Sequence, residues 1–162
     1  MSSAVLRVLV GVLLVGACRG GEDGASETSV QSEQVELRTS VIGAATERTE
    51  PIATGEVLEG STLGGSPFCV GGTILDSHGS PDPEVALISR RITCPDGRVR
   101  MDTAPEVSQG MPQGLTQTGS WTIVSGTGAF EGLRGSGEME IVYDPDLNEL
   151  AARETYTGTV TH

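Results

Sequence analysis

The sequence contains no lysine, few aromatic residues and only three cysteines. All basic residues are arginine, and 22 acidic residues against 10 basic ones give a net charge of −12. An acidic chain is repelled by phosphate backbones, so we expect no nucleic-acid partner. A Walker-type phosphate site needs a lysine and is therefore excluded. Because aromatic residues make up only 3% of the chain, we expect a modestly stable core that a covalent cross-link would help.

The first residues predict export. Arg7 precedes an apolar run, 8–15, that is too short to span a bilayer of about 30 Å as a helix. We therefore predict a cleaved signal peptide over 1–17 and an extracytoplasmic location, in the cell envelope or secreted. The ending Val-Gly-Ala-Cys is similar to a bacterial lipobox, in which Cys18 would carry lipid and anchor the protein to the outer leaflet or another envelope membrane. The alternative is conventional cleavage without lipid.

A polar segment follows the signal peptide. Residues 19–34 are acidic and rich in Gly and Ser, so they cannot bury enough apolar surface to fold. Residues 35–42 alternate weakly and could form an early strand, but AATERTEP after them favours a compact domain that begins near Pro51. We therefore predict a flexible, anchored linker over 18–50 and a folded domain over 51–162.

The folded domain shows the pattern of strands. Apolar residues recur at every second position, turn residues interrupt them, and no useful length has a helical period. This pattern predicts an all-β sandwich or barrel, and a closed antiparallel barrel would leave no exposed edge. The expected strands are 55–59, 68–76, 85–94, 98–102, 120–125, 138–143 and 154–161.

Two cysteines remain if Cys18 carries the anchor. In an exported chain, Cys69 and Cys94 form an even pair that should be oxidised. The midpoint between them falls at Pro81-Asp82 in a predicted turn, so a hairpin centred there places them opposite each other. A disulfide that closes a loop of roughly 26 residues should contribute about 3 kcal/mol.

The segment 126–137 (GTGAFEGLRGSG) matches a variant of the dinucleotide fingerprint. That fingerprint works because a helix follows the glycines and holds the pyrophosphate. Here Gly135 and Gly137 disfavour a helix, and the next residues, GEMEIVYD, form a strand pattern. We interpret the segment as a wide connection between two strands, with Phe130 and Leu133 pointing inward, and we expect no cofactor.

The longer segment 119–137 (GSWTIVSGTGAFEGLRGSG) resembles the signature of allene oxide cyclase-like barrels and, more loosely, of plant dirigent proteins. Segments 68–76 and 93–97 are similar to the bacterial extracytoplasmic branch, so the resemblance covers about residues 52–161. It implies an eight-stranded, calycin-like antiparallel barrel, often trimeric in plants, where cyclases steer ring closure of a fatty-acid epoxide and dirigent proteins steer radical coupling. No catalytic carboxylate of either family matches a position here, and Glu131 is interpreted as structural.

Arg90 is the first candidate binding residue. In a strand, Arg90 lies on the same face as Ile88 and Ile92, and in the predicted hairpin it lies opposite Thr73. If this face is interior, the guanidinium could bind a ligand carboxylate through two parallel hydrogen bonds. The competing arrangement turns the face outward and places Leu87 and its neighbour Val85 inside.

Trp121 and Tyr143 are the other candidate ligand-binding residues. They lie on apolar strand faces, so they are core residues unless the barrel is hollow. His78 belongs to a predicted exposed turn rather than a catalytic triad. The segment 144–148 (DPDLN) begins like a calcium loop but lacks the glycine and glutamate that such a loop needs, so we predict no metal site.

Three functions remain. The first is a binding or structural role at the bacterial envelope, with a small apolar ligand and possible self-association. The second is a cyclase- or isomerase-like enzyme, for which the sequence identifies no catalytic residue. The third is a protein-interaction module that uses the long loop 103–119. A solid barrel interior would exclude both a cyclase and a small-molecule binder with its ligand in the barrel, and would leave interaction.

Overall fold

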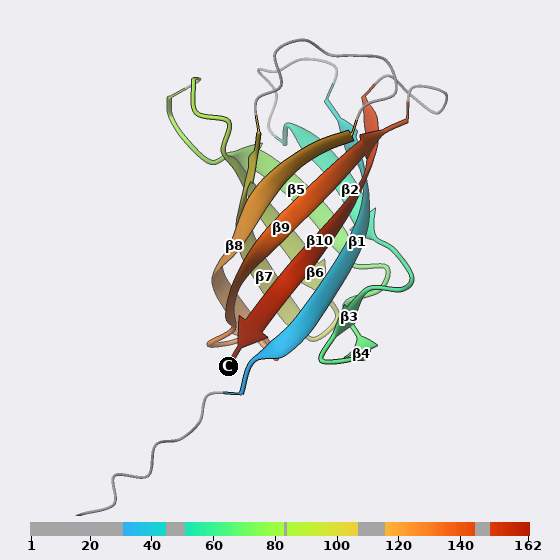
Figure 1. Ribbon diagram of the computed structural model, residues 1–162, viewed down its shortest axis with the longest axis vertical. Helices are drawn as coiled ribbons and strands as arrows, with labels where there is room; N and C mark the ends of the chain where they lie inside the picture. Colours follow the sequence, from blue (N-terminus) through green and yellow to red (C-terminus); the bar gives the residue numbers. More distant parts are fainter. Residues whose placement is uncertain (1–30, 45–50, 83, 107–115, 145–149) are drawn as a thin grey trace, which may run out of the picture.

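The protein is a closed β-barrel in the computed structural model, which describes residues 31–44, 51–82, 84–106, 116–144 and 150–162. Ten strands form one antiparallel sheet in the order β10-β9-β8-β7-β6-β5-β2-β1-β3-β4, and pairing of β10 with β1 closes eight of them into a barrel (Figure 1). The predicted all-β barrel is confirmed. Among the described residues, no helix is long and apolar enough to cross a membrane.

The strand bounds extend most of the predicted segments. The strands are β1 (Glu33–Gly43), β2 (Ala53–Val57), β3 (Thr62–Leu63), β4 (Ser66–Pro67), β5 (Thr73–His78), β6 (Ile88–Cys94), β7 (Gly97–Pro105), β8 (Thr116–Gly128), β9 (Arg134–Tyr143) and β10 (Ala151–Thr161). We call the end of the barrel where β1, β5, β7 and β9 terminate the mouth. The other end is the base, and the short β3–β4 hairpin lies there beside the first half of β1 (Figure 1).

The barrel begins earlier than predicted. Residues 33–43, assigned above to the linker, form β1, which pairs with β10 along ten positions from Glu33↔Val160 to Ile42↔Ala151. The domain boundary at Pro51 is therefore wrong. The weak alternation of this segment is real, because its inward side chains Val35, Leu37 and Val41 are buried while Glu36 and Arg38 lie on the outer face. The signal peptide, Cys18 and most of the linker lie outside the described residues.

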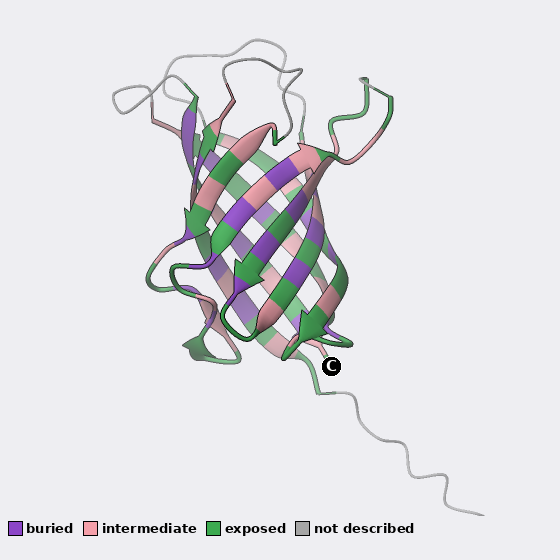
Figure 2. Cartoon of the chain, turned by 180° about the vertical axis from the view of Figure 1, so that it is seen from behind, coloured by how far each residue is buried: buried purple, intermediate pink, exposed green. Residues whose placement is uncertain are grey.

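Alternate residues of each long strand face the packed interior and the polar exterior of the barrel. Buried and exposed residues alternate along each long strand (Figure 2). Trp121, Met139 and Tyr156 all face inward with at most 3% of their surface exposed. The interior surface predicted for these strands is confirmed.

Glycines on β9 and β10 make room for the largest interior ring. Gly137 lies directly opposite Trp121 on one side and Gly158 on the other. A Cβ atom at Gly158 would lie 2.8 Å from Cζ2 of Trp121, so a side chain there would displace the indole. The Trp121 Nε1–H donates to the backbone oxygens of Glu138 and Thr157 at 3.0 and 3.2 Å, which satisfies its single donor.

The predicted disulfide is confirmed. Cys69 and Cys94 are bonded, with their Cα atoms 5.2 Å apart. Cys69, however, lies in a turn and not in a strand: its φ is 50°, and its carbonyl accepts a hydrogen bond from the Gly72 N–H at 2.8 Å. The bond therefore joins the turn before β5 to the end of β6, and β5 begins at Thr73 rather than at residue 68.

This turn changes the register of the β5–β6 hairpin. The prediction placed Arg90 opposite Thr73, but Thr73 pairs with Thr93, and Arg90 pairs with Asp76. The predicted register assumed that both cysteines were strand residues facing each other, which the turn at Cys69 prevents. A three-residue shift results, and it brings a carboxylate in place of a threonine opposite the arginine.

The glycine-rich segment is a hairpin and contains no helix. β8 continues to Gly128 and β9 begins at Arg134, so the connection is narrower than predicted. Gly128 has a φ of 64°, a conformation that favours glycine. Leu133 is fully buried and Phe130 packs against the core, as predicted; Phe130 also meets Phe68 edge-on at 5.6 Å between ring centroids. These side chains close the base of the barrel.

Candidate functional site

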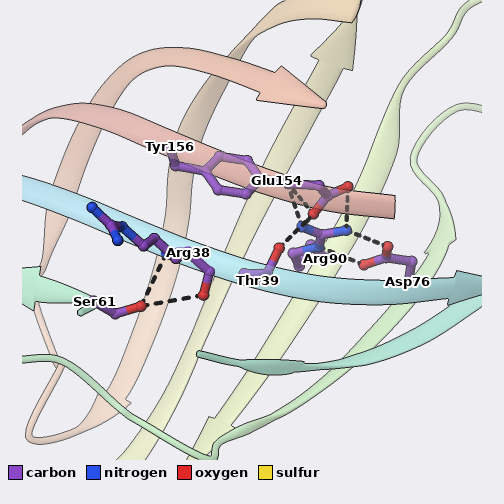
Figure 3. Close-up of polar contacts among 7 residues, drawn as sticks. All are labelled: Arg38, Thr39, Ser61, Asp76, Arg90, Glu154 and Tyr156. Carbon is purple, nitrogen blue, oxygen red and sulfur yellow. Dashed lines mark hydrogen bonds and ion pairs between the residues drawn. The ribbon is translucent and has the colours of Figure 1, made fainter. Parts of the chain in front are cut away.

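The mouth half of the barrel holds a buried polar cluster around Arg90 (Figure 3). β6 supplies Arg90, β5 supplies Asp76, and β10 supplies Glu154 and Tyr156. Thr39 on β1 completes the cluster. All five are at most 6% exposed, so they are interior residues of the barrel wall.

Arg90 faces the interior, which decides between the two arrangements considered from the sequence. The alternative with Val85 inside is wrong: Val85 is 49% exposed and Arg90 only 1%. β6 begins at Ile88, so Val85 and Leu87 precede the strand and do not continue its alternation. The apolar character of this loop had made the outward placement of Arg90 competitive.

All five N–H donors of the Arg90 guanidinium form hydrogen bonds with protein groups. Nε and Nη2 donate to the two oxygens of Asp76 at 2.8 and 2.6 Å, a fork-to-fork pair. Nη2 also donates to Oε1 of Glu154 at 3.2 Å, and Nη1 donates to Oε2 of Glu154 and to the Tyr156 hydroxyl. Because arginine has five N–H donors, a ligand carboxylate would have to displace one of these partners.

Glu154 has further partners. Its Oε2 accepts hydrogen bonds from the Thr39 hydroxyl at 2.7 Å and from the Tyr156 hydroxyl at 2.8 Å. The Tyr156 ring lies 5.5 Å from the Arg90 Cζ atom, within the range of a cation–π contact. One arginine therefore serves two carboxylates, and the ionised cluster carries one net negative charge.

Burial acts differently on the two carboxyl groups. Burial raises the pKa of Asp76 above its usual range, and the hydrogen bonds and charge of Arg90 offset this only in part. Burial also opposes ionisation of Glu154, but the charge of Arg90 and the hydrogen bonds from Arg90, Thr39 and Tyr156 together hold the pKa of Glu154 below its usual value. Asp76 is therefore the carboxyl group that takes up a proton first on acidification.

The three predicted ligand-binding residues do not share a pocket. Tyr143 is half-buried at the mouth, where its hydroxyl donates to Oε1 of Gln117 at 2.9 Å. Burial and the charge of Glu154 raise the pKa of Tyr143. Trp121 instead lines a small apolar cavity toward the base, to which neither Arg90 nor Tyr143 contributes. Their roles as ligand contacts remain predictions.

The cavity inside the barrel is very small. Its volume is about 20 Å³, and its walls are apolar side chains such as Leu37, Ile92, Met101 and Trp121. A cavity needs roughly 10–15 Å³ of such space to hold one water, so this cavity has room for about one water and not for an organic ligand. The interior is filled by side chains, which is one of the two outcomes open to a barrel of eight strands.

A much larger hollow lies at the mouth. Its volume is about 610 Å³, and its walls combine the ends of β5, β6 and β7 with the loop between β5 and β6. Most of the lining is apolar, including Ile52, Val85, Leu87, Ile88 and Pro105, with His78 and Asp82 as polar members. Ile88 lies two residues from Arg90 on β6, and His78 lies two residues from Asp76 on β5. The polar cluster is therefore one step of the strand alternation farther from the mouth than the hollow.

Sequence reasoning missed the two carboxylates of the cluster. Asp76 shares a strand face with Ile74, and Glu154 shares one with Tyr156, and all four are buried. An acidic residue at an apolar-face position was the available signal. His78 is exposed, as predicted, but it is the last residue of β5 and not part of a turn.

Metal ligation has no support in the described part of the chain, where no group of three or more His, Cys, Asp or Glu side chains could hold an ion. Of the calcium-like segment 144–148, all but Asp144 lies outside the described residues, as does most of the loop 103–119 from residue 107 to 115.

Comparisons with known proteins identify no family for this chain. No protein-family model matches this chain, and no curated protein matches it in sequence. The solved structure of the pterocarpan synthase dirigent protein GePTS1 is similar, with 14% sequence identity and a TM-score of 0.36 over 91% of this chain and 97% of that one. A similarity of this degree carries no argument about this chain.

Proposed function

We propose that the protein is a binding protein that takes a small apolar ligand at the mouth of the barrel rather than inside it. The observation that carries the proposal is the contrast between the two spaces: about 610 Å³ at the mouth and about 20 Å³ inside. Ligand pockets typically have roughly 300–1,000 Å³ and mainly apolar walls with a few polar groups. The mouth hollow meets both criteria.

The cluster beneath the hollow supports a scaffold role for the barrel. Its hydrogen bonds join β1, β5, β6 and β10, so they hold the strands that carry the hollow. From the sequence we considered an internal site in which Arg90 binds a ligand carboxylate. In the structure, protein groups already accept all five N–H donors of Arg90. We therefore place the ligand outside the cluster and do not extend the proposal to a cyclase or isomerase.

We further propose that this binding takes place outside the cytoplasm, with the barrel secreted or anchored through lipid on Cys18. The support is the signal-like sequence 1–17 and the disulfide, since disulfides persist in oxidising compartments. Segment 119–137 supports membership in the allene oxide cyclase-like barrels, and segments 68–76 and 93–97 support their bacterial branch.

Binding of a neutral apolar fluorophore, N-phenyl-1-naphthylamine, tests the mouth site. We expect saturable binding to the wild type, and about tenfold weaker binding to Val85→Glu, because the added carboxylate places a charge in the apolar wall. Val70→Glu is the matched control: Val70 is 44% exposed against 49% for Val85, and it lies at the base next to Cys69. Equal weakening by both variants, or no saturable binding, would contradict the proposal.

A further inference from the structure

Three arginines lie together on the outer wall of the barrel. Arg91 on β6 pairs directly with Arg100 on β7, and Arg98 lies two positions from Arg100 on the same face of β7. All three side chains are exposed. We call these three residues the arginine strip.

The strip is electrostatically unfavourable as it stands. Like charges directly opposite each other on neighbouring strands destabilise a sheet. With 22 acidic residues against 10 basic ones, composition favours an acidic neighbour for each arginine, yet Arg91 faces Arg100. In the described part of the chain, neither the Arg91 nor the Arg98 side chain forms a hydrogen bond or an ion pair. The strip therefore has positive charge available for an anion.

Arg100 is held in place for such a contact. Its Nε donates to the Ser89 hydroxyl at 3.1 Å, and its Nη2 lies 3.9 Å from Oδ1 of Asp102. The Asp102 contact is too long for a hydrogen bond, so it neutralises Arg100 only in part. These two neighbours orient the guanidinium, and Nη1 has no partner among the described residues.

A hollow of about 610 Å³ adjoins the strip on the outer wall. Its polar groups come from Arg91, Arg100, Ser89, Ser77 and His78, Asp76 also lines it, and Pro51 and Leu75 supply apolar surface. It is a different space from the mouth hollow, with which it shares only His78. A charged group at the arginines would therefore have room beside it for an organic body.

We propose that the arginine strip binds an organic phosphate monoester, with the phosphate bridging Arg91 and Arg100 and the organic group lying over Leu75. A phosphate monoester carries about −1.5 to −2 charges at neutral pH and three acceptor oxygens, which match two guanidiniums. A carboxylate has one charge and two oxygens and is satisfied by a single arginine fork. Because the rest of the molecule is strongly acidic, its field disfavours such an anion elsewhere on the surface.

Calorimetric titration of the exported chain with phenyl phosphate at low ionic strength tests this site. We expect saturable one-to-one binding that is at least about tenfold weaker in Arg91→Gln and in Arg100→Gln, since each removes a charge-assisted contact. Arg153→Gln is the matched control, because Arg153 is an exposed arginine on the outer face of β10. Absence of saturable binding, or an equal loss in Arg153→Gln, would overturn the proposal.

Three further ligands identify the chemistry that is bound. We expect inorganic phosphate to bind more weakly than phenyl phosphate if the hollow holds the organic group, and benzoate and phenyl sulfate to bind more weakly because each carries a single charge. If inorganic phosphate binds as tightly as phenyl phosphate, the hollow does not contact the organic group, and that part of the proposal is wrong. Benzoate binding as tightly would overturn the phosphate assignment.

The thermal stability of the ligand-free variant separates binding from folding. Arg91→Gln relieves the repulsion with Arg100, so we expect an unchanged or higher Tm. A Tm lowered by several degrees, together with lost binding, would assign Arg91 to the fold and overturn the proposal.

Discussion

At the scale of single residues, Arg90 is the arginine that lies buried in the barrel interior. It is a charged side chain with 1% exposure, and its five N–H donors all meet acceptors on Asp76, Glu154 and Tyr156. A buried charge is tolerated only when it is paired and hydrogen-bonded, and removal of one partner leaves an uncompensated charge. The residue is therefore essential to the stability of the wall that carries the mouth hollow.

Replacement of Arg90 by leucine should destabilise the protein strongly. Arg90→Leu leaves Asp76 and Glu154 buried without a cation, and we expect the free energy of unfolding to fall by about 3–5 kcal/mol in urea denaturation. Arg91→Leu, on the same strand but facing solvent, should change it by less than about 0.5 kcal/mol.

A further variant covers the case in which Arg90→Leu does not fold. Replacement of Arg90, Asp76 and Glu154 together by Met, Leu and Leu removes all the charges, and it should recover most of the lost stability. A triple variant no more stable than Arg90→Leu would show that the charges are not the cause.

At this scale the sequence showed which residues share a strand face with Arg90, but it decided neither whether that face is interior nor which residues are its partners. The parity of Arg90 with Ile92 was visible, but its partners come from β5 and β10, 14 and 64 residues away along the chain. The predicted partner, Thr73, was wrong because a hairpin register depends on where its strands begin. A local turn at Cys69 decided that point, and no pattern of apolar residues marked it.

At the scale of elements, the glycine-rich hairpin between β8 and β9 shows how small residues shape a barrel. A Cβ atom at Gly126 would lie 1.8 Å from the backbone oxygen of Phe130, a distance that no side chain tolerates. The close approach turns the chain back and directs Leu133 and Phe130 to the base, where they cover the apolar interior.

Gly126→Ala should therefore be destabilising. We expect a loss of about 1–3 kcal/mol in unfolding free energy, because the added methyl group forces the hairpin backbone apart. The control is Gly43→Ala, where the nearest atom to the new Cβ would be Cβ of Leu150 at 3.5 Å, an ordinary contact. That variant should be neutral or up to about 1 kcal/mol more stable, since alanine restricts the unfolded chain. Equal effects of the two changes would refute the close-approach explanation.

At the scale of the whole molecule, β1 closes the barrel. It lies between β10 on one side and β2 and β3 on the other, so its loss would expose two sheet edges and open the interior. The same closure fills the centre with side chains and leaves the large hollows at the mouth and on the outer wall. The binding sites that we propose therefore lie around the barrel and not inside it.

Two truncations test where the folded unit begins. A chain that starts at residue 33 retains β1, and we expect the same melting temperature and circular dichroism as for a chain that starts at residue 18. A chain that starts at Pro51, the boundary predicted from the sequence, lacks β1 and should aggregate or lose its cooperative transition. Cooperative unfolding of the shorter chain at an unchanged temperature would show that β1 is dispensable.

The sequence by itself determined the class of the fold, the inward residues of β8, β9 and β10, the oxidised cysteine pair and the architectural nature of the glycine-rich segment. These properties depend on local periodicity, on the chemistry of turn residues and on cysteine pairing, all of which are written along the chain. Only the tertiary structure decided that β1 belongs to the barrel, that Asp76 and Glu154 share Arg90, and that three arginines form one outer strip. The reason is that barrel closure and strand register bring together residues far apart in sequence, and neither is encoded in any single segment.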